Sequence, residues 1–93
     1  MENTYSIGDR SVSVGDVFKH FKEGKMYLVV GFAISTETEE ILVLYRPVVF
    51  LPEEDKVWAR PLGMFLSRVD KNKYPEAKQE YRFEYLGRHE EIK

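Results

Sequence analysis

The 93-residue chain contains no cysteine, so it can form no disulfide and can use no thiolate in catalysis or metal binding. No apolar run in it approaches the ~20 residues that a membrane-spanning helix requires. The first 14 residues are polar and lack the apolar core of a signal peptide. We therefore expect a cytoplasmic protein with no membrane segment.

An excess of positive charge is also absent, since the formal net charge is −2 at pH 7. Broad, non-specific binding to nucleic acid normally requires a basic face. The total charge therefore argues against that class of function. A local basic patch is still compatible with it, and its candidate members are Lys19, Lys22, Lys25, Arg46 and Arg60.

The sequence motifs of common enzyme classes are missing: there is no Gly-rich phosphate loop, no nucleophile elbow and no cluster of metal ligands. The two histidines, His20 and His89, are far apart in the sequence, whereas zinc normally takes three or four ligands. As a general base, His20 would need a positioned partner, for which Glu37 is the candidate. We expect no metal and no cofactor, and a small hydrolase that uses these two residues is the least favoured hypothesis.

The chain is long enough for one compact domain and too short for two. We divide it into residues 1–13, an N-terminal tail or edge strand, residues 14–87, a single β-barrel domain, and residues 88–93, a C-terminal tail. Aromatic residues make up 14% of the chain, and a few of them can fill a small core.

Two long apolar segments, Met26–Ile34 and Ile41–Phe50, predict a central hairpin joined by a polar turn at residues 35–40. Strict alternation would place Met26, Leu28, Val30, Phe32 and Ile34 on one face of the first segment. Gly31 is typical of a bulge or sharp bend. Pro47 cannot donate to a strand ladder, so the second segment should bend there or lie at an edge.

Shorter elements flank this hairpin. We expect strands at Val17–Lys22, at Val57–Arg60 and at Tyr81–Leu86, and an edge strand at Tyr5–Ile7 or Val12–Val14. Pro61 should open a helical turn that continues to Val69. About five or six strands with one short helical turn, and no βαβ rhythm, predict a mainly β fold, a small SH3-like or OB-like barrel.

Several motifs follow one another in a fixed order. They are Gly15-Asp16-Val17-Phe18-Lys19-His20-Phe21-Lys22 with Tyr27, Val29 and Ala33; Glu37-Thr38; Val43 with Tyr45-Arg46; and Trp58-Ala59-Arg60-Pro61 with Met64-Phe65. In this order and spacing, over about residues 15–68, the chain resembles the domain-of-unknown-function family 1653. The resemblance implies a small SH3-like barrel found mainly in bacteria and phages, and it implies no established activity.

The chain departs from the family pattern at Ser35-Thr36-Glu37-Thr38, where the family typically has His-Ser-Glu-Thr. A hydroxyl therefore replaces an imidazole, and any role of that imidazole as a base or ligand is lost. The segment Leu51–Lys56 is also longer than the short turn usual in the family.

Polar and aromatic residues within these motifs form the candidate ligand site: His20, Glu37, Tyr45, Arg46, Trp58 and Arg60. Trp58 and Arg60 lie two apart on a strand and share a face, which suits a flat aromatic ligand, a nucleobase or a carboxylate. The alternative is that Trp58 closes the barrel and Arg60 pairs with an acid.

The other candidates also have structural alternatives. Tyr45 and Arg46 are adjacent and point to opposite faces, so one should be core, and Arg46 could pair with Glu37 or Glu40. His20 could be a hydrogen-bonded surface residue, and Glu37-Thr38 could stabilise the turn. Met64-Phe65 should plug one end of the barrel.

The preferred function is a non-enzymatic binding module with a polar-aromatic groove for a peptide, a nucleotide or single-stranded nucleic acid. A nucleic-acid-associated barrel is the alternative. Both long strands are apolar on both faces, so another surface should cover the outer face of the sheet. A second copy of the chain in a homodimer would cover it, and so would a C-terminal loop folded over the sheet.

Overall fold

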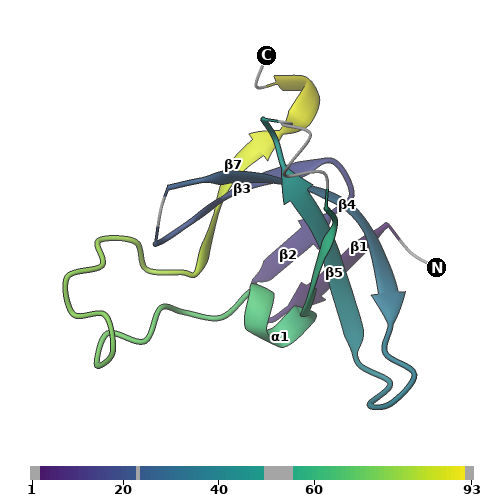
Figure 1. Ribbon diagram of the computed structural model, residues 1–93, viewed down its shortest axis with the longest axis horizontal. Coiled ribbons are helices and arrows are strands. Elements are labelled where there is room, and N and C mark those ends of the chain that lie inside the picture. Colours follow the sequence, from purple (N-terminus) through teal and green to yellow (C-terminus); the bar gives the residue numbers. More distant parts are fainter. Residues whose placement is uncertain (1–2, 23, 50–55, 92–93) are drawn as a thin grey trace.

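The computed structural model describes residues 3–22, 24–49 and 56–91 (Figure 1). Within these ranges the fold is mainly β, as the sequence predicts. It has seven strands in two antiparallel sheets, where about five or six strands were expected. The larger sheet contains, in spatial order, β6 (Trp58–Pro61), β5 (Ile41–Pro47), β4 (Met26–Ile34), β3 (Asp16–His20) and β7 (Phe83–Arg88). Closure of this sheet into an SH3-like barrel stays a prediction.

The central hairpin of β4 and β5 forms as predicted, but a bulge in β4 changes which of its residues share a face. Val29 lies opposite Tyr45 and Gly31 opposite Leu44, so Val30 is an extra residue in β4. Beyond the bulge, Phe32 packs against the same core as Val29, while Val30 is exposed. The prediction that Val30 and Phe32 share a face is therefore wrong, because the bulge breaks strict alternation.

The N-terminal segment forms a second sheet of two strands, β1 (Thr4–Ile7) and β2 (Arg10–Ser13), instead of a single edge strand. The hairpin is part of the packed structure: Val12 is fully buried in the core, and the Tyr5 ring contacts the Phe32 ring edge-on at 4.7 Å. Arg10 adds a polar attachment, since its guanidinium donates hydrogen bonds to the carbonyl of Leu66 and, at 2.9 Å, to that of Phe83.

The helix α1 (Leu62–Phe65) follows β6 directly and is shorter than the predicted turn through Val69. In the described ranges, no helix is long and apolar enough to cross a membrane. Phe65 is fully buried, whereas Met64 is 47% exposed. Only Phe65 of the predicted Met64-Phe65 plug therefore fills the core.

The last strand, β7, begins two residues later than predicted and continues through Arg88, where a frayed tail was expected. A 3-10 helix, η2 (His89–Glu91), follows it. Of the aromatic residues in this strand, Phe83 is fully buried and Tyr85 is half exposed. Phe83 and Tyr85 pair with His20 and Phe18 in unbroken register, because the shift between Val17 and Phe18 comes after Tyr85 in β7. The two rings therefore share a face of this edge strand and differ in burial.

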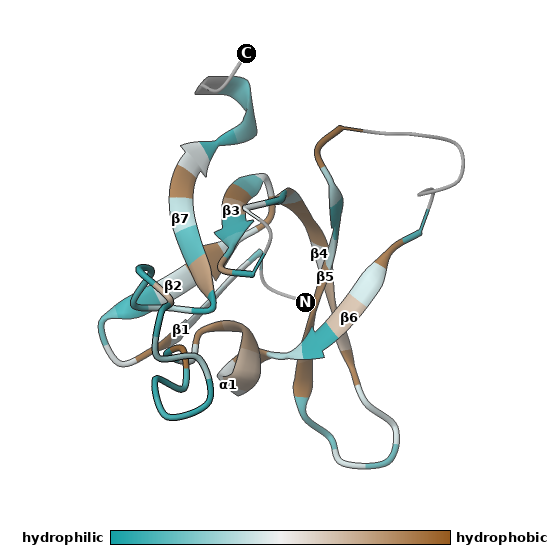
Figure 2. Ribbon diagram, turned by 60° about the vertical axis from the view of Figure 1, so that its left-hand side comes forward, coloured by the Kyte–Doolittle hydropathy of each residue, from teal (hydrophilic) through white to brown (hydrophobic). Residues whose placement is uncertain are grey.

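The core is built mainly from aromatic rings. Phe65 and Phe83 stack in nearly parallel planes with their centroids 4.1 Å apart, and Phe18 meets Phe65 edge-on at 5.1 Å. All three are fully buried. Figure 2 shows the hydrophobic colouring concentrated on the strands and α1, while the loop of residues 70–79 is largely hydrophilic.

A buried carboxylate joins the start of β3 to the end of β7. Asp16 is 6% exposed; it accepts a hydrogen bond from the Ser13 backbone N–H at 2.8 Å and one from Arg88 Nη1 at 3.2 Å. Burial raises the pKa of the Asp16 carboxyl, and these two donors partly oppose that shift. Gly15, in the left-handed region at φ 95°, passes so close to Arg88 that a Cβ there would lie 2.9 Å from Nη2.

The buried position of Val12 leads to a stability prediction for the N-terminal hairpin. Val12→Ala should lower the free energy of unfolding by about 2 kcal/mol, because it removes fully buried methyl groups and leaves a cavity. Ile7→Ala in the same hairpin, where the side chain is 47% exposed, should cost about 0.5 kcal/mol. Urea denaturation of the two variants measures the difference, and equal losses would show that the hairpin is not packed on the core.

The Asp16–Arg88 pair predicts a pH-dependent loss of stability. Arg88→Met removes a donor from a buried carboxylate and should cost about 1–2 kcal/mol near neutral pH, a range that allows for the partly exposed guanidinium. It also raises the pKa of Asp16 further above the unfolded value. The loss of unfolding free energy in Arg88→Met is therefore present at a pH above the folded-state pKa of Asp16. It disappears as the pH falls to about 3, which is below the pKa of Asp16 in the unfolded chain. Urea titrations at both pH values test this, and in an Asp16→Asn background the effect of Arg88→Met should not change with pH.

Candidate functional site

A hollow of about 230 Å³, here called the Trp58 hollow, lies on the larger sheet. It is lined by His20, Lys22, Tyr27, Tyr45, Trp58, Arg60 and Phe83. Every strand of the larger sheet contributes at least one of these side chains. Four of the six predicted site residues, namely His20, Tyr45, Trp58 and Arg60, are therefore brought together by the order of the strands.

The Arg60 guanidinium is held in place at one edge of this hollow. Its Nε donates a hydrogen bond to the Tyr45 hydroxyl at 3.2 Å, and its Cζ lies 5.5 Å from the centre of the Phe83 ring. No described residue accepts a hydrogen bond from its two Nη groups. This differs from the alternative reading, in which Arg60 pairs with an acid across the sheet. The fixed guanidinium can offer its remaining donors to an anion.

Trp58 provides the exposed ring of the hollow. It lies opposite Tyr45 in the β5–β6 register and is 52% exposed. It makes no ring contact with another aromatic residue of the described ranges. The alternative in which Trp58 closes the barrel core is therefore wrong, and the exposed part of Trp58 is accessible to a ligand.

Aromatic rings in edge-to-face contact form the floor of the Trp58 hollow. The Tyr45 ring meets Tyr27 edge-on at 5.2 Å and Phe83 at 5.3 Å. His20 packs edge-on against Phe83 at 4.9 Å. Because Tyr45 and Phe83 are buried, the floor is rigid and apolar, and polar groups lie at its edge.

His20 forms a hydrogen bond, in agreement with the alternative that it is a hydrogen-bonded residue. Its Nδ1 accepts the backbone N–H of Lys22 at 3.3 Å, so the neutral imidazole carries its proton on Nε2. The same ring contacts Phe21 at 4.9 Å. These contacts fix the ring between β3 and β7.

Glu37 does not reach the hollow, because it lies in the β4–β5 turn (Figure 1). In that turn the Ser35 hydroxyl accepts the backbone N–H groups of Glu37 and Thr38, and Thr38 Oγ1 accepts that of Glu40. Ser35 thus stabilises the turn. The His20–Glu37 pair that a hydrolase would need is not formed.

Arg46 is also outside the hollow. It lies opposite Leu28 near the end of β5, while the turn that carries Glu37 and Glu40 begins after the Ile34–Ile41 pair at the other end. Pairing of Arg46 with either glutamate is therefore inconsistent with the register. As predicted, one residue of this adjacent pair is core: Tyr45 is buried, while Arg46 does not line the hollow.

Three lining residues, Lys22, Tyr27 and Phe83, were not among the predicted site residues. Tyr27 belongs to the family-like motifs, and Lys22 was a member of the predicted basic patch, so both had a sequence signal. No sequence signal placed Phe83 in the site, because its position beside His20 depends on β3 pairing with β7 across more than 60 residues of chain.

A second and larger hollow of about 560 Å³, the Tyr74 hollow, lies between β3, β7 and the loop of residues 70–79. It is lined by Lys19, Phe21, Lys22, Gly24, Tyr74, Glu76, Ala77, Lys78, Gln79 and Glu84. Of these, Lys22 also lines the Trp58 hollow. Across the described ranges, no group of three or more His, Asp or Glu residues is placed to hold a metal ion.

Comparison with known proteins gives one match. A family model described as a protein of unknown function, DUF1653, matches residues 16–85, a range that includes the residues lining both hollows. No curated protein and no solved structure matches the chain.

The exposure of Trp58 predicts that this residue contributes little to folding. Trp58→Ala should change the free energy of unfolding by less than about 1 kcal/mol, as for other surface positions. Phe65→Ala, at a fully buried ring, should cost about 3–5 kcal/mol and serves as the matched control. Urea denaturation followed by far-UV circular dichroism compares them, and a loss in Trp58→Ala as large as the control would place Trp58 in the core.

Proposed function

The chain belongs to the DUF1653 family of proteins of unknown function, and we propose that it is a non-enzymatic binding module whose Trp58 hollow takes one nucleotide unit. In this proposal the base stacks on Trp58, and the phosphate is bound by Arg60 and Lys22. The observation that carries it is the exposed indole next to an anchored guanidinium, above a floor of buried rings.

The exposed indole supports stacking of a flat ring. A half-exposed tryptophan keeps apolar surface in water, and a flat ligand would cover it. Stacking of a base on an aromatic side chain contributes about 1–3 kcal/mol and accepts any of the bases, since each has a π-face. Because Arg60 is two residues along the same strand, an anion attached to the base would come within its reach.

The charges around the hollow favour an anionic ligand. Arg60 and Lys22 line it, and none of its described lining residues is acidic. A ring-lined hollow is also typical of sites for quaternary ammonium groups. Here the two cations would repel such a group, so a nucleotide phosphate fits better than a methylated lysine.

The size of the hollow limits the ligand to one unit. At about 230 Å³ it is smaller than the roughly 300–1,000 Å³ of most small-molecule sites. A base with part of its sugar fits this space, and a dinucleotide cofactor does not. Binding without chemistry is supported by His20, whose Nδ1 is already hydrogen-bonded, and by the distant position of Glu37.

Loss of the stacking ring should weaken binding of single nucleotides. We expect Trp58→Ala to lower the affinity for each of the four nucleoside monophosphates by about 5- to 150-fold, which corresponds to the stacking energy. Arg60→Met should also lower it, and should lower the affinity for the unphosphorylated nucleosides much less. Amide chemical-shift titrations of the labelled protein measure these affinities.

Matched controls separate a local effect from a general one. Tyr85→Ala removes another half-exposed ring, and Arg68→Met removes a guanidinium that pairs with Glu80 away from the hollow. Both should bind nucleotides like the parent chain. Equal binding by Trp58→Ala and the parent, or shifts that do not involve the Trp58 hollow, would contradict the proposed function.

A further inference from the structure

We propose that the ligand is a single-stranded nucleic acid that runs from the Trp58 hollow into the Tyr74 hollow, so that the chain binds an oligonucleotide in preference to a free nucleotide. This inference rests on the proposed function of the Trp58 hollow and adds a second subsite and a ligand class to it. Four observations support it: a shared lysine, a continuous row of rings, a second ring with cations, and a braced loop.

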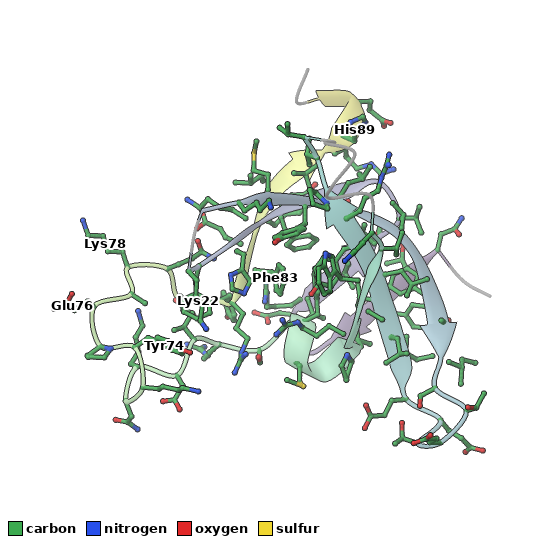
Figure 3. All side chains as sticks on the ribbon, in the orientation of Figure 1. Lys22, Tyr74, Glu76, Lys78, Phe83 and His89 are labelled. Atoms are coloured by element: carbon green, nitrogen blue, oxygen red, sulfur yellow. The ribbon has the colours of Figure 1, made fainter. Side chains whose placement is uncertain are left out.

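The shared residue is Lys22, which follows β3 and lines both hollows. Its Nζ lies 5.0 Å from the centre of the Tyr74 ring. Figure 3 shows Lys22 between Tyr74 on one side and Phe83 on the other. A phosphate that links two nucleotide units would therefore meet an ammonium group where the two hollows adjoin.

A row of ring contacts connects the two hollows beside this lysine. The Tyr74 ring contacts Phe21 at 5.0 Å, Phe21 contacts His20 at 4.9 Å, and His20 contacts Phe83 at 4.9 Å. The ends of this row are thus no more than about 15 Å apart. A strand carries a phosphate about every 3.4 Å at duplex spacing, so an oligonucleotide of about four to six units covers the distance.

The Tyr74 hollow repeats the pairing of a ring with a cation. Tyr74 has both Lys22 and Lys73 within 5.5 Å of its ring centre. The hydrogen bond from Lys22 lowers the pKa of the Tyr74 phenol, as expected of a ring in a cationic environment.

The acidic residues of the Tyr74 hollow leave it an excess of positive charge. Glu84 lies opposite Lys19 in the β3–β7 register, and Glu76 is the other carboxylate. Lys22 and Lys78 complete the charged lining. Among the described lining residues, three ammonium groups thus stand against two carboxylates.

The loop that carries Tyr74 is braced in the unbound protein. The Gln79 amide donates hydrogen bonds to the carbonyls of Lys19 and Tyr81 at 2.9 and 2.8 Å. Lys71 Nζ donates to the carbonyls of Ala77 and Gln79. Because the loop is already held, ordering it would cost a ligand little free energy.

The chemistry of the two hollows favours a polynucleotide over an acidic peptide. A polynucleotide repeats one flat ring and one anion in every unit, and the surface repeats one ring and one cation, as Trp58 with Arg60 and as Tyr74 with Lys22. An acidic peptide would satisfy the cations and leave the rings uncovered. Stacking and a cationic path are the features that proteins use to bind single strands.

The experiment compares thymidine 5′-monophosphate with oligothymidylates of two to six units, by quenching of Trp58, the chain's single tryptophan. In the parent chain, affinity should rise at least tenfold between one and six units and should fall with added salt. Tyr74→Ala should remove most of that rise, and it should lower the hexamer affinity by a much larger factor than the monophosphate affinity. Tyr85→Ala, which removes a half-exposed tyrosine outside both hollows, should keep the full rise.

Two further arms complete the design. Lys22→Met should weaken hexamer binding and reduce the slope of log affinity against log salt by about one, as expected for one lost phosphate contact. Chemical-shift titration of Trp58→Ala with the hexamer replaces quenching in the variant that lacks the reporter, and it should show weakened binding. A tyrosine-containing polyglutamate peptide tests the alternative macromolecule.

The outcomes separate the two proposals. Monophosphate binding at Trp58 with no gain from chain length, or a gain that survives Tyr74→Ala, overturns the strand path and leaves the proposed function standing. Absence of binding by the monophosphate and by every oligothymidylate overturns both. Binding of the peptide at the two hollows without oligonucleotide binding overturns the strand path and assigns the surface to an acidic protein segment.

Discussion

The stacked pair of Phe65 and Phe83 is the contact on which the rest of the structure depends. One ring comes from α1 and the other from β7, which are separated by the loop of residues 66–82. Phe18 and Tyr45 close around the pair edge-on, so β3 and β5 are fixed to the same two rings. In a chain this small, each buried aromatic residue supplies a large share of the apolar area that holds the fold together.

The same pair explains why a polar, ring-lined hollow can form next to the core. Phe83 has one side in the stack and another side in the floor of the Trp58 hollow, where His20, Tyr45 and Arg60 contact it. The ligand-facing rings therefore rest on buried ones and have little freedom to rearrange.

Arg10 anchors the N-terminal hairpin to the backbone carbonyls of Leu66 and Phe83, so this hairpin is also attached to the core.

Much of the fold follows from the sequence, because continuous β-branched and aromatic segments dictate strands whatever their neighbours are. The central hairpin and the aromatic content of the core are examples. Bulges are harder to predict, since one extra residue at Val30 reverses the faces of everything after it, and only Gly31 indicates where this occurs. The bounds of β7 were predicted two residues too early, and Phe83 and Tyr85 share a face in unbroken register although only Phe83 is buried.

The candidate site was partly predictable. Trp58 and Arg60 share a face because they are two apart on one strand, and the structure places them in one hollow. Glu37 and Arg46 are close to the others in the motif order, and strand register separates them from the hollow. Register depends on the turn and on bulges such as the one at Val30, and Gly31 is the residue in the sequence that indicates this bulge.

The Trp58 hollow draws on all five strands of the larger sheet, and this has a thermodynamic consequence. No partly unfolded form that has released an edge strand can retain the complete hollow, because β6 carries Trp58 and Arg60 and β7 carries Phe83. A ligand bound there would hold the two edges of the sheet together and suppress local opening at both. Occupancy would then be reported by slowed amide exchange in strands that never touch one another, and the sheet would respond to its ligand as one cooperative unit.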